Sequence, residues 1–347
     1  MNGKAGRGMK VGIIGAGLQG GRRAQALKEF NDKLVIVADV QLERAKLLAE
    51  TMKCTATDKW ETVVTSSDIE VVVVCTPPHL HELICTSALK NGKHVLCEKP
   101  LGRTVEEAQS IVNIARENGV VLKCGFNHRH HPGIVQAREW FDSGIIGELS
   151  FIRCRYGISG RLDYEKEWRM NPEISGGGQL IDQGMHVIDL SRWFLGNFTE
   201  VTGFLQTAFW DIAPVEDNAF CLLRTEKGQV ASIHVSWTEW KNLFSFELFG
   251  KNGYILVEGL GGSYGVEKAV LGRRTFLAPF KEEVIEFRGQ DRSWYEEWKE
   301  FSSAINDGRE PLGNGIDGLK ALELAGVIYQ SVQDSKVVKL KKGSFGF

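Results

Sequence analysis

An aspartate, a histidine and a second aspartate are spaced along one expected helix. The three glycines of 176–178 precede an apolar periodic segment, which predicts a tight turn followed by a helix of about four turns. Asp182, His186 and Asp189 lie at positions i, i+4 and i+7, so one face of this helix carries both carboxylates and the imidazole. An imidazole titrates near neutrality and a neighbouring acid fixes its tautomer, so this face is suited to proton transfer. A surface ion pair would have the same spacing, and these residues alone leave both interpretations open.

A glycine-rich turn near the start of the chain predicts a dinucleotide site. The segment Gly15-Ala16-Gly17-Leu18-Gln19-Gly20 lies between a short apolar strand pattern at 10–14 and a helical stretch that reaches residue 30. Glycines in this arrangement let the backbone approach a pyrophosphate, whose charge faces the helix N-terminus. We therefore predict that the cofactor contacts Gly15, Gly17, Leu18 and Gln19. A glycine turn that serves packing alone is the alternative.

The second strand pattern indicates which dinucleotide binds. It covers 34–38 and ends in Asp39, 19 residues beyond Gly20. An acid at this point bonds the adenosine ribose hydroxyls and repels a 2′-phosphate. Asp39 is therefore a predicted cofactor-binding residue, and NAD is favoured over NADP.

Two further loops follow strand patterns and are expected at the same edge of the sheet. Thr76-Pro77-Pro78 ends the β-branched run 71–75, and Glu98-Lys99-Pro100 ends a strand that begins at residue 94. In an open α/β sheet the loops after the carboxyl ends of the strands line the ligand crevice. A lysine there can polarise a substrate oxygen, although a Glu–Lys surface pair is the alternative. The residues predicted to lie at the cofactor are Thr76, Pro77, His81, Glu98 and Lys99.

The order of the expected elements predicts two domains of different class. Strand and helix patterns alternate through residues 1–125, which is typical of a doubly wound parallel sheet, the Rossmann type of α/β fold. Residues 126–347 contain a series of strands joined by hairpin turns, together with helices such as that of the 180s. This part is predicted to be an α+β domain with a large, mostly antiparallel open sheet.

Composition limits the classes of partner. The 347 residues are 43% apolar and 25% charged, with a formal net charge of -2, so no bulk positive charge attracts nucleic acid or an anionic membrane. Seven cysteines without a C-x-x-C pair indicate reduced thiols, and no segment has the length of a membrane span, so we expect a cytoplasmic protein. The histidines of the segment 126–131 have no acid or cysteine at ligand spacing, so we predict no metal site.

Four of these motifs occur together and in a fixed order. They are the glycine turn, Thr76-Pro77-Pro78 with His81, Glu98-Lys99-Pro100, and the glycines 176–178 with Asp182 and His186. In this combination the chain resembles, over nearly its full length, the glucose-fructose oxidoreductase / inositol 2-dehydrogenase / rhizopine-catabolism (Gfo/Idh/MocA) family of NAD(P)-dependent oxidoreductases.

The resemblance implies an activity and a set of roles. It implies hydride transfer between a nicotinamide and a secondary alcohol or ketone of a sugar, inositol, polyol or sugar nucleotide, with Lys99, Asp182 and His186 at the catalytic positions. It places the substrate near the segment 153–173, where Arg155, Tyr156, Trp168 and Arg169 are the predicted contacts. It also implies a homodimer or homotetramer formed through the C-terminal sheet.

Other functions on the same fold stay open from the sequence. One is a dinucleotide-binding sugar sensor without turnover, against which the presence of Lys99, Asp182 and His186 argues. The others are a glycosidase that uses bound NAD in a transient oxidation, and a reductase of a tetrapyrrole or a dihydrodiol.

Overall fold

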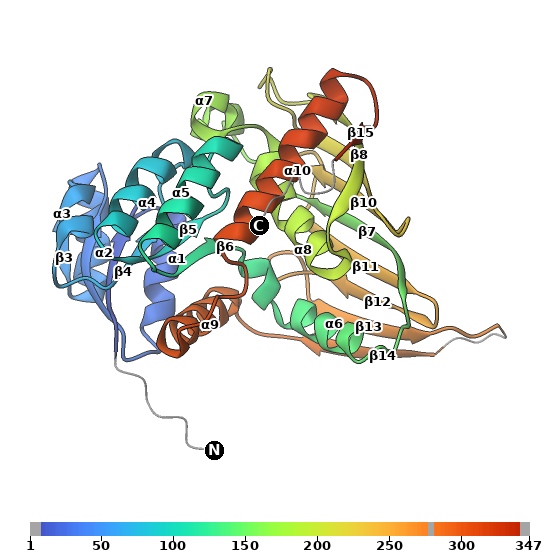
Figure 1. Cartoon of the computed structure of the whole chain (residues 1–347), viewed down its shortest axis with the longest axis horizontal. Helices are drawn as coiled ribbons and strands as arrows, with labels where there is room; N and C mark the ends of the chain where they lie inside the picture. Colours follow the sequence, from blue (N-terminus) through green and yellow to red (C-terminus); the bar gives the residue numbers. More distant parts are fainter. Residues whose placement is uncertain (1–7, 277–280, 341–347) are drawn as a thin grey trace, which may run out of the picture. The chain divides into compact units, whose positions relative to one another are not determined.

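The computed structural model describes residues 8–276 and 281–340 and divides the chain into two compact units (Figure 1). The first unit comprises Met1–Phe126 with Trp294–Leu319, and the second comprises Asn127–Ser293 with Lys320–Phe347. Residues 294–319 therefore belong to the first unit, although they follow most of the second in sequence. Each unit is built around its own sheet.

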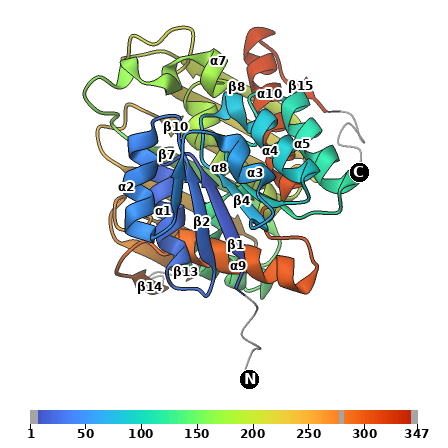
Figure 2. The same cartoon turned by 90° about the vertical axis from the view of Figure 1, so that its left-hand side faces the viewer.

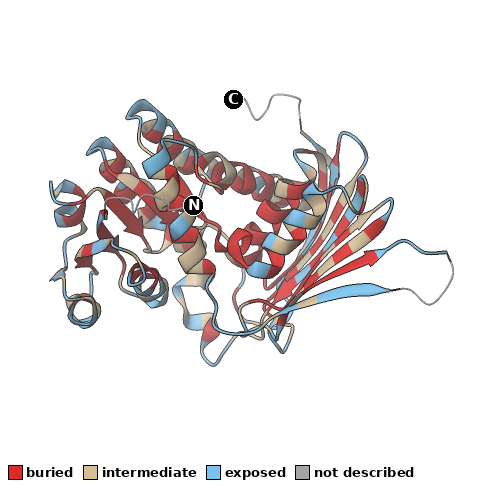
Figure 3. Ribbon diagram, turned by 90° about the horizontal axis from the view of Figure 1, so that it is seen from below, coloured by how far each residue is buried: buried red, intermediate tan, exposed pale blue. Residues whose placement is uncertain are grey.

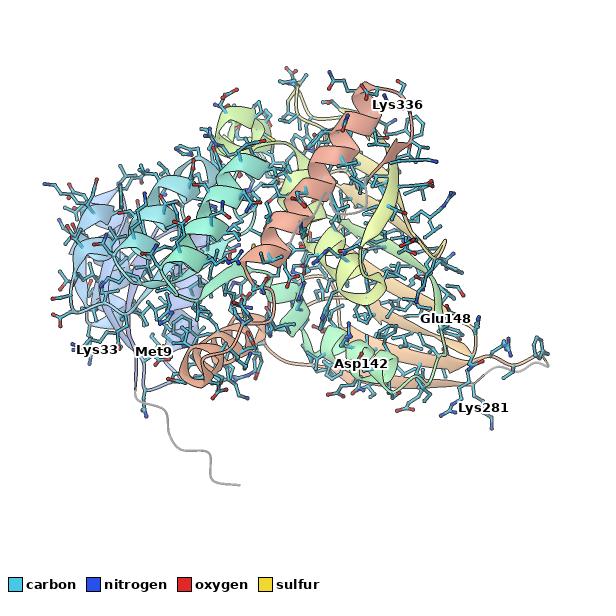
Figure 4. The ribbon with its side chains drawn as sticks, viewed as in Figure 1. Met9, Lys33, Asp142, Glu148, Lys281 and Lys336 are labelled. Carbon is cyan, nitrogen blue, oxygen red and sulfur yellow. The ribbon has the colours of Figure 1, made fainter. Side chains whose placement is uncertain are left out.

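The sheet of the first unit is parallel and has the order β3-β2-β1-β4-β5-β6. Its strands are β1 (Lys10–Ile14), β2 (Lys33–Ala38), β3 (Thr55–Thr57), β4 (Val71–Val74), β5 (His94–Glu98) and β6 (Leu122–Gly125). Met9 and Lys33, both labelled in Figure 4, mark the starts of β1 and β2, where the Lys33 amide donates to the Met9 carbonyl at 2.8 Å. Successive strands are added toward one edge of the sheet from β1 to β3 and toward the other edge from β4 to β6. Ligands of folds of this type bind between β1 and β4, where this order reverses.

Helices cover both faces of this parallel sheet. They are α1 (Leu18–Leu27), α2 (Leu42–Met52), α3 (Trp60–Thr65), α4 (His81–Lys90), α5 (Val105–Glu117) and α9 (Ser293–Asp307). Figure 2 shows α1 and α2 to one side of the strands and α3, α4 and α5 to the other. Trp298 and Phe301 of α9 complete the core that α1 and α2 form with β1, β2 and β4. Because both faces are covered, all four residues of β4 are buried, as the continuous β-branched run predicts.

The sheet of the second unit has nine strands in the order β14-β13-β12-β11-β7-β10-β9-β8-β15, and β7 and β10 form its one parallel pair among the described residues. The strands are β7 (Leu149–Gly157), β8 (Phe198–Gln206), β9 (Asn218–Thr225), β10 (Val230–Ser236), β11 (Leu243–Gly250), β12 (Gly253–Glu258), β13 (Glu267–Arg273), β14 (Glu282–Phe287) and β15 (Val338–Lys339). The helices are α6 (Pro132–Asp142), α7 (Pro172–Ser175), α8 (Met185–Leu195) and α10 (Gly315–Gln333), the last of which begins in the first unit.

One face of this second sheet packs on helices and the other is open. Residues of β9 alternate between buried positions, such as Ala219 and Cys221, and exposed ones, such as Phe220 and Leu222. The strands in Figure 3 show the same alternation of buried and exposed residues along their length. α6 packs on β12 and β13, and α8 packs on β7 and β10. The predicted fold class, a parallel Rossmann-type sheet followed by an α+β part with a mostly antiparallel sheet, is confirmed.

Candidate active site

The glycine turn of the first unit has the backbone geometry that a bound phosphate needs. Gly15 has φ +99°, and a side chain there would meet the Cys75 carbonyl oxygen at 2.6 Å. A side chain at Gly20 would lie 1.9 Å from the Gly15 carbonyl oxygen, so this glycine permits the close packing of α1. A side chain at Gly17 would meet nothing within 4 Å, and the helix that starts there has no acid in its first turn. The helix N-terminus therefore faces open space without a negative side chain of its own, which fits a pyrophosphate.

Asp39 lies beside this turn and is held by backbone amides. Its Oδ2 accepts a hydrogen bond from the Ala16 amide at 2.8 Å, and its Oδ1 accepts one from the Gln41 amide at 2.8 Å. Ala16 belongs to the glycine turn, so the carboxylate is fixed next to the expected phosphate position. Asp39 directly follows β2, the position from which the acid of a dinucleotide site bonds the adenosine ribose.

His81 connects the two loops that follow β4 and β5. Its Nε2 lies 2.8 Å from the Thr76 carbonyl oxygen, and its Nδ1 lies 2.8 Å from the Pro100 carbonyl oxygen. The ring is buried, and burial lowers the pKa of His81 although both carbonyls favour the protonated form. Pro100 directly follows Lys99, so His81 ties the loop that carries this lysine to Thr76 and Pro77.

Glu98 is held by a buried network of charges. Arg23 on α1 donates to Glu98 Oε1 from Nε at 2.8 Å and pairs with Glu297 of α9 through Nη1. Lys123 on β6 has its Nζ 3.7 Å from Glu297 Oε1, and both of these side chains are fully buried. The network fixes the backbone immediately before Lys99, which itself is half-buried. Because buried charges require partners, removing one member would leave another uncompensated.

In the second unit, the glycines 176–178 allow Tyr329 and Glu216 to approach the backbone closely. Gly176 has φ +86°, whereas a side chain at Gly177 would lie 2.3 Å from the Tyr329 hydroxyl, and one at Gly178 would lie 2.3 Å from the Glu216 carbonyl oxygen. Gly176 therefore allows a left-handed backbone conformation, and Gly177 and Gly178 allow the two close contacts.

Glu216 and Tyr329 fix the start of the helix that follows. Glu216 Oε1 accepts a hydrogen bond from the Leu180 amide and another from the Tyr329 hydroxyl, each at 2.9 Å. The Gln179 amide donates to the Glu216 carbonyl oxygen at 3.0 Å. Burial raises the pKa of the Glu216 carboxyl. These contacts anchor the turn from which Asp182 and His186 project.

The helix of the 180s differs from the single α-helix that the sequence predicts. It opens with a π-helical turn, Leu180–Gly184, and becomes α-helical only in α8. Single π turns of this kind occur frequently at functional sites. Asp189 does not act as a free second carboxylate on the helix face, because it accepts from Arg129 Nε at 2.7 Å and from Arg129 Nη2 at 2.6 Å, with both side chains buried.

His186 is buried and packs on a second imidazole. Its ring lies 3.7 Å from the His128 ring, centroid to centroid, at an interplanar angle of 19°. The Tyr156 ring lies 6.5 Å away, edge-on, and also contacts His128 at 5.2 Å. The sequence indicates His128 only as a possible metal ligand and carries no signal for this stack. Within 8–276 and 281–340 no three His, Cys, Asp or Glu side chains are grouped as metal ligands.

Asp182 lies beside two of the predicted substrate contacts. Its Oδ2 is 3.8 Å from Arg169 Nε, and the Arg169 guanidinium lies over the Trp168 ring at 4.5 Å from the centroid. Arg155, the remaining predicted contact, is exposed, whereas its neighbour Tyr156 is buried. Because successive strand residues point to opposite faces, Arg155 lies on the open face of the sheet, away from α8.

Two family models match this chain. Residues 9–126 match the oxidoreductase family model with an NAD-binding Rossmann fold, and residues 134–256 match the GFO/IDH/MocA C-terminal domain. The chain belongs to the Gfo/Idh/MocA oxidoreductase family. The resemblance drawn from the four motifs is thereby confirmed.

Several relatives of this Gfo/Idh/MocA chain are sugar and inositol dehydrogenases. The D-glucoside 3-dehydrogenase of Escherichia coli is 32% identical over 66% of this chain and 70% of that protein. The levoglucosan dehydrogenase of Pseudarthrobacter phenanthrenivorans is 28% identical over 72% of this chain and 73% of that protein. The myo-inositol 2-dehydrogenase of Thermotoga maritima is 26% identical over 96% of this chain and 99% of that protein.

A solved structure of a levoglucosan dehydrogenase in complex with NADH has the same fold. It superposes with a TM-score of 0.89 at 24% identity and covers 97% of this chain and 100% of that one.

In the ranges that the structure describes, no helix combines the length and apolar character needed to cross a membrane.

Proposed function

We propose that this protein transfers a hydride between NAD and a secondary alcohol, or the corresponding ketone, of a sugar, inositol or related polyol. The observation that carries the proposal is the open helix N-terminus at Gly17 with the Asp39 carboxylate fixed beside it. A pyrophosphate fits the first, and an adenosine ribose without a 2′-phosphate fits the second. Gly15, Leu18, Gln19, Thr76 and Pro77 complete the proposed cofactor contacts, with His81 and Glu98 holding the loops. When bound, the nicotinamide supplies the hydride acceptor.

The protein's own side chains supply the proton chemistry. In the oxidation direction, His186 removes the proton of the substrate hydroxyl, and Lys99 donates a hydrogen bond to the same oxygen, stabilising the negative charge that develops there. Asp182 orients the site and offsets positive charge there, including that of Arg169, whose Nε lies 3.8 Å from Asp182 Oδ2. Tyr156, Trp168 and Arg169 are the proposed substrate contacts.

A substrate screen tests this function. The protein is incubated with NAD or NADP and with polyols, aldoses, glycosides and nucleotide-linked sugars, and the absorbance of the reduced nicotinamide is followed. We expect turnover with NAD and at least one sugar-like alcohol. Lys99→Ala and His186→Ala are each expected to lower kcat by about 10²- to 10⁴-fold, the usual contribution of a positioned acid or base.

The exposed Lys90 of α4 supplies a matched control. Lys90→Ala removes the same charge from the surface and should leave kcat unchanged. Near-normal turnover by Lys99→Ala would remove this lysine from the scheme, and the same holds for His186→Ala.

We also propose that the protein forms a homodimer or homotetramer through the open face of the second sheet. Phe204, Phe220 and Leu222 are exposed on β8 and β9. Large exposed apolar patches on a folded protein are typical of association surfaces. A second copy would cover this patch by the same surface, as closed symmetric assemblies do.

A further inference from the structure

Two large aromatic side chains are exposed together on loops of the second unit. Phe209 lies between β8 and β9, and Trp240 lies between β10 and β11; they are 60% and 61% exposed. Their ring centroids are 4.7 Å apart at an interplanar angle of 83°. We name this pair the aromatic platform.

The loop that carries Phe209 is held rigidly by a buried carboxylate. Asp217 accepts hydrogen bonds from the amides of Ala208 at 2.9 Å, Phe209 at 2.8 Å and Trp210 at 3.1 Å. The Trp210 Nε1 also donates to the Trp237 carbonyl oxygen at 3.1 Å. An exposed aromatic ring on a loop tied at three successive amides is presented in one orientation, so little entropy is lost when a ligand binds it.

Trp240 stands in a backbone conformation that bulky residues rarely adopt. Its φ is +56°, in the left-handed region. Such a conformation is unfavourable for a bulky residue, and residues held in it cluster at active sites and ligand-binding segments. Asparagine or glycine would occupy this position without strain, so the exposed indole there is a feature that packing does not explain.

A chain of ring contacts connects the platform to the residues around Asp182. Phe209 contacts Trp210 at 5.2 Å, and Trp210 contacts the buried Tyr164 at 5.6 Å. Burial and then the charge of Asp182 raise the pKa of Tyr164, so this phenol lies in the field of that carboxylate. Three ring contacts therefore separate the exposed Trp240 from the neighbourhood of the proposed catalytic residues.

The ion pairs of the segment 161–169, which carries Tyr164, favour an uncharged ligand. In the segment 161–169, Arg161 Nε lies 2.6 Å from Glu167 Oε1, Arg169 Nη1 lies 3.0 Å from Glu167 Oε2, and Lys166 Nζ lies 2.5 Å from Asp163 Oδ1. These cations already have carboxylate partners, so they are poorly suited to the diphosphate of a sugar nucleotide. Aromatic faces instead suit the apolar C–H face of a pyranose.

We infer that the platform binds the second ring of a glycoside whose first ring reacts at the proposed site. The inference rests on the proposed function, since it extends the same substrate beyond the reacting ring. The substrate class is then a neutral disaccharide or glycoside, and the free monosaccharide is the poorer substrate because it leaves the platform uncovered.

The test compares a monosaccharide with its disaccharide in wild-type protein and in Trp240→Ala and Phe209→Ala. We expect wild-type kcat/KM to be higher for the disaccharide than for the monosaccharide. In each variant the ratio of these two kcat/KM values should fall by about tenfold, while kcat/KM for the monosaccharide stays unchanged. Leu47→Ala, which removes an exposed apolar side chain on α2 of the first unit, is the matched control and should preserve the advantage.

Three results would overturn the inference. In the first, both variants change the monosaccharide and the disaccharide equally. In the second, the disaccharide has no advantage in the wild-type protein. In the third, Trp240→Ala dissociates the protein into smaller species in sedimentation, which would assign the platform to a second copy of the chain.

Failure of the proposed function is recognised separately. If no sugar is oxidised by the wild-type protein, hydride transfer is wrong, and calorimetric titration with the disaccharide then decides the platform alone. Binding that weakens about tenfold in Trp240→Ala supports the platform, and equal binding by both proteins overturns it.

Discussion

The Asp39 side chain has two roles. It accepts hydrogen bonds from the backbone amides of Ala16 and Gln41, and it is proposed to face the adenosine ribose. The amide contacts hold the carboxylate at the turn, where we propose that its charge opposes a 2′-phosphate. One carboxylate and its geometry therefore carry the proposed preference for NAD.

Replacing Asp39 is expected to relax this choice. Asp39→Ser removes the negative charge, so the ratio of kcat/KM with NAD to that with NADP should fall by about tenfold or more, through a gain with NADP and a loss with NAD. Steady-state rates with both cofactors measure the ratio. Asp58→Asn removes an exposed charge from the turn after β3 and is the control. An unchanged ratio in Asp39→Ser would assign cofactor choice to other residues.

Residues of the site differ in how far the sequence reveals them. Asp39, Asp182 and His186 are indicated by spacing within one element or across one strand–helix unit, where periodicity operates. Glu216 and His128 are not, because their contacts with Leu180 and His186 join segments far apart in the sequence. The local sequence around a single glutamate, or around one histidine of a cluster, does not indicate which distant residue it will contact in the fold.

At the scale of elements, Asp217 organises the loop between β8 and β9. Burial alone would raise its pKa, but the amides of Ala208, Phe209 and Trp210 and the Asn218 side chain outweigh burial and hold the pKa below its ordinary value. A lowered pKa in the folded protein means that the carboxylate stabilises the loop above the ordinary Asp pKa of about 3.9. This stabilisation is lost as the pH falls through the lowered value.

Asp217→Asn is therefore expected to loosen this loop in a pH-dependent way. At neutral pH the variant should lose about 1–3 kcal/mol of local stability, because charge-assisted hydrogen bonds become neutral and one acceptor becomes a donor. Hydrogen exchange of a peptide covering 207–217 measures the loss as reduced protection. The difference from wild type should shrink at acid pH, where the wild-type carboxylate is also protonated.

Asp211→Asn provides the comparison for the Asp217 variant. Asp211 is an exposed acid of the same loop, and its replacement should leave protection unchanged. Equal protection of wild type and Asp217→Asn at neutral pH would contradict the assigned role of this carboxylate.

Elements with a strong pattern are those that the sequence predicts. The β-branched β4, the glycine turn with α1, and the hairpins β9–β10 and β11–β12 are present as expected. The short β3 and the acidic β14 have no such pattern, since the first has three residues and the second begins with two glutamates at the sheet edge. No periodic pattern predicts the π-helical turn before α8 either. This turn is held by Glu216 and Tyr329, which lie in distant segments of the sequence.

At the scale of the whole molecule, the chain returns to its first unit after completing most of the second. The amphipathic pattern of α9 indicates a helix with one apolar face, but it does not indicate which core that face joins. Trp298 and Phe301 enter the core of α1 and α2, and Glu297 meets Arg23 across 274 positions of sequence. A contact between residues so far apart in the sequence depends on the whole fold, so it cannot be predicted from periodicity.

The open face of the second sheet leads to the last prediction, which concerns assembly. Leu222 stands on this face between the exposed Phe220 and Arg224, and its replacement by glutamate places a charge in the proposed contact between copies. A buried unpaired carboxylate opposes association by several kcal/mol, so Leu222→Glu should sediment as a smaller species than wild type. Leu47→Glu introduces the same charge on α2 and should leave the mass unchanged. A wild-type protein that sediments as a monomer, or a Leu222→Glu variant of unchanged mass, would show that copies of the chain do not associate through this face.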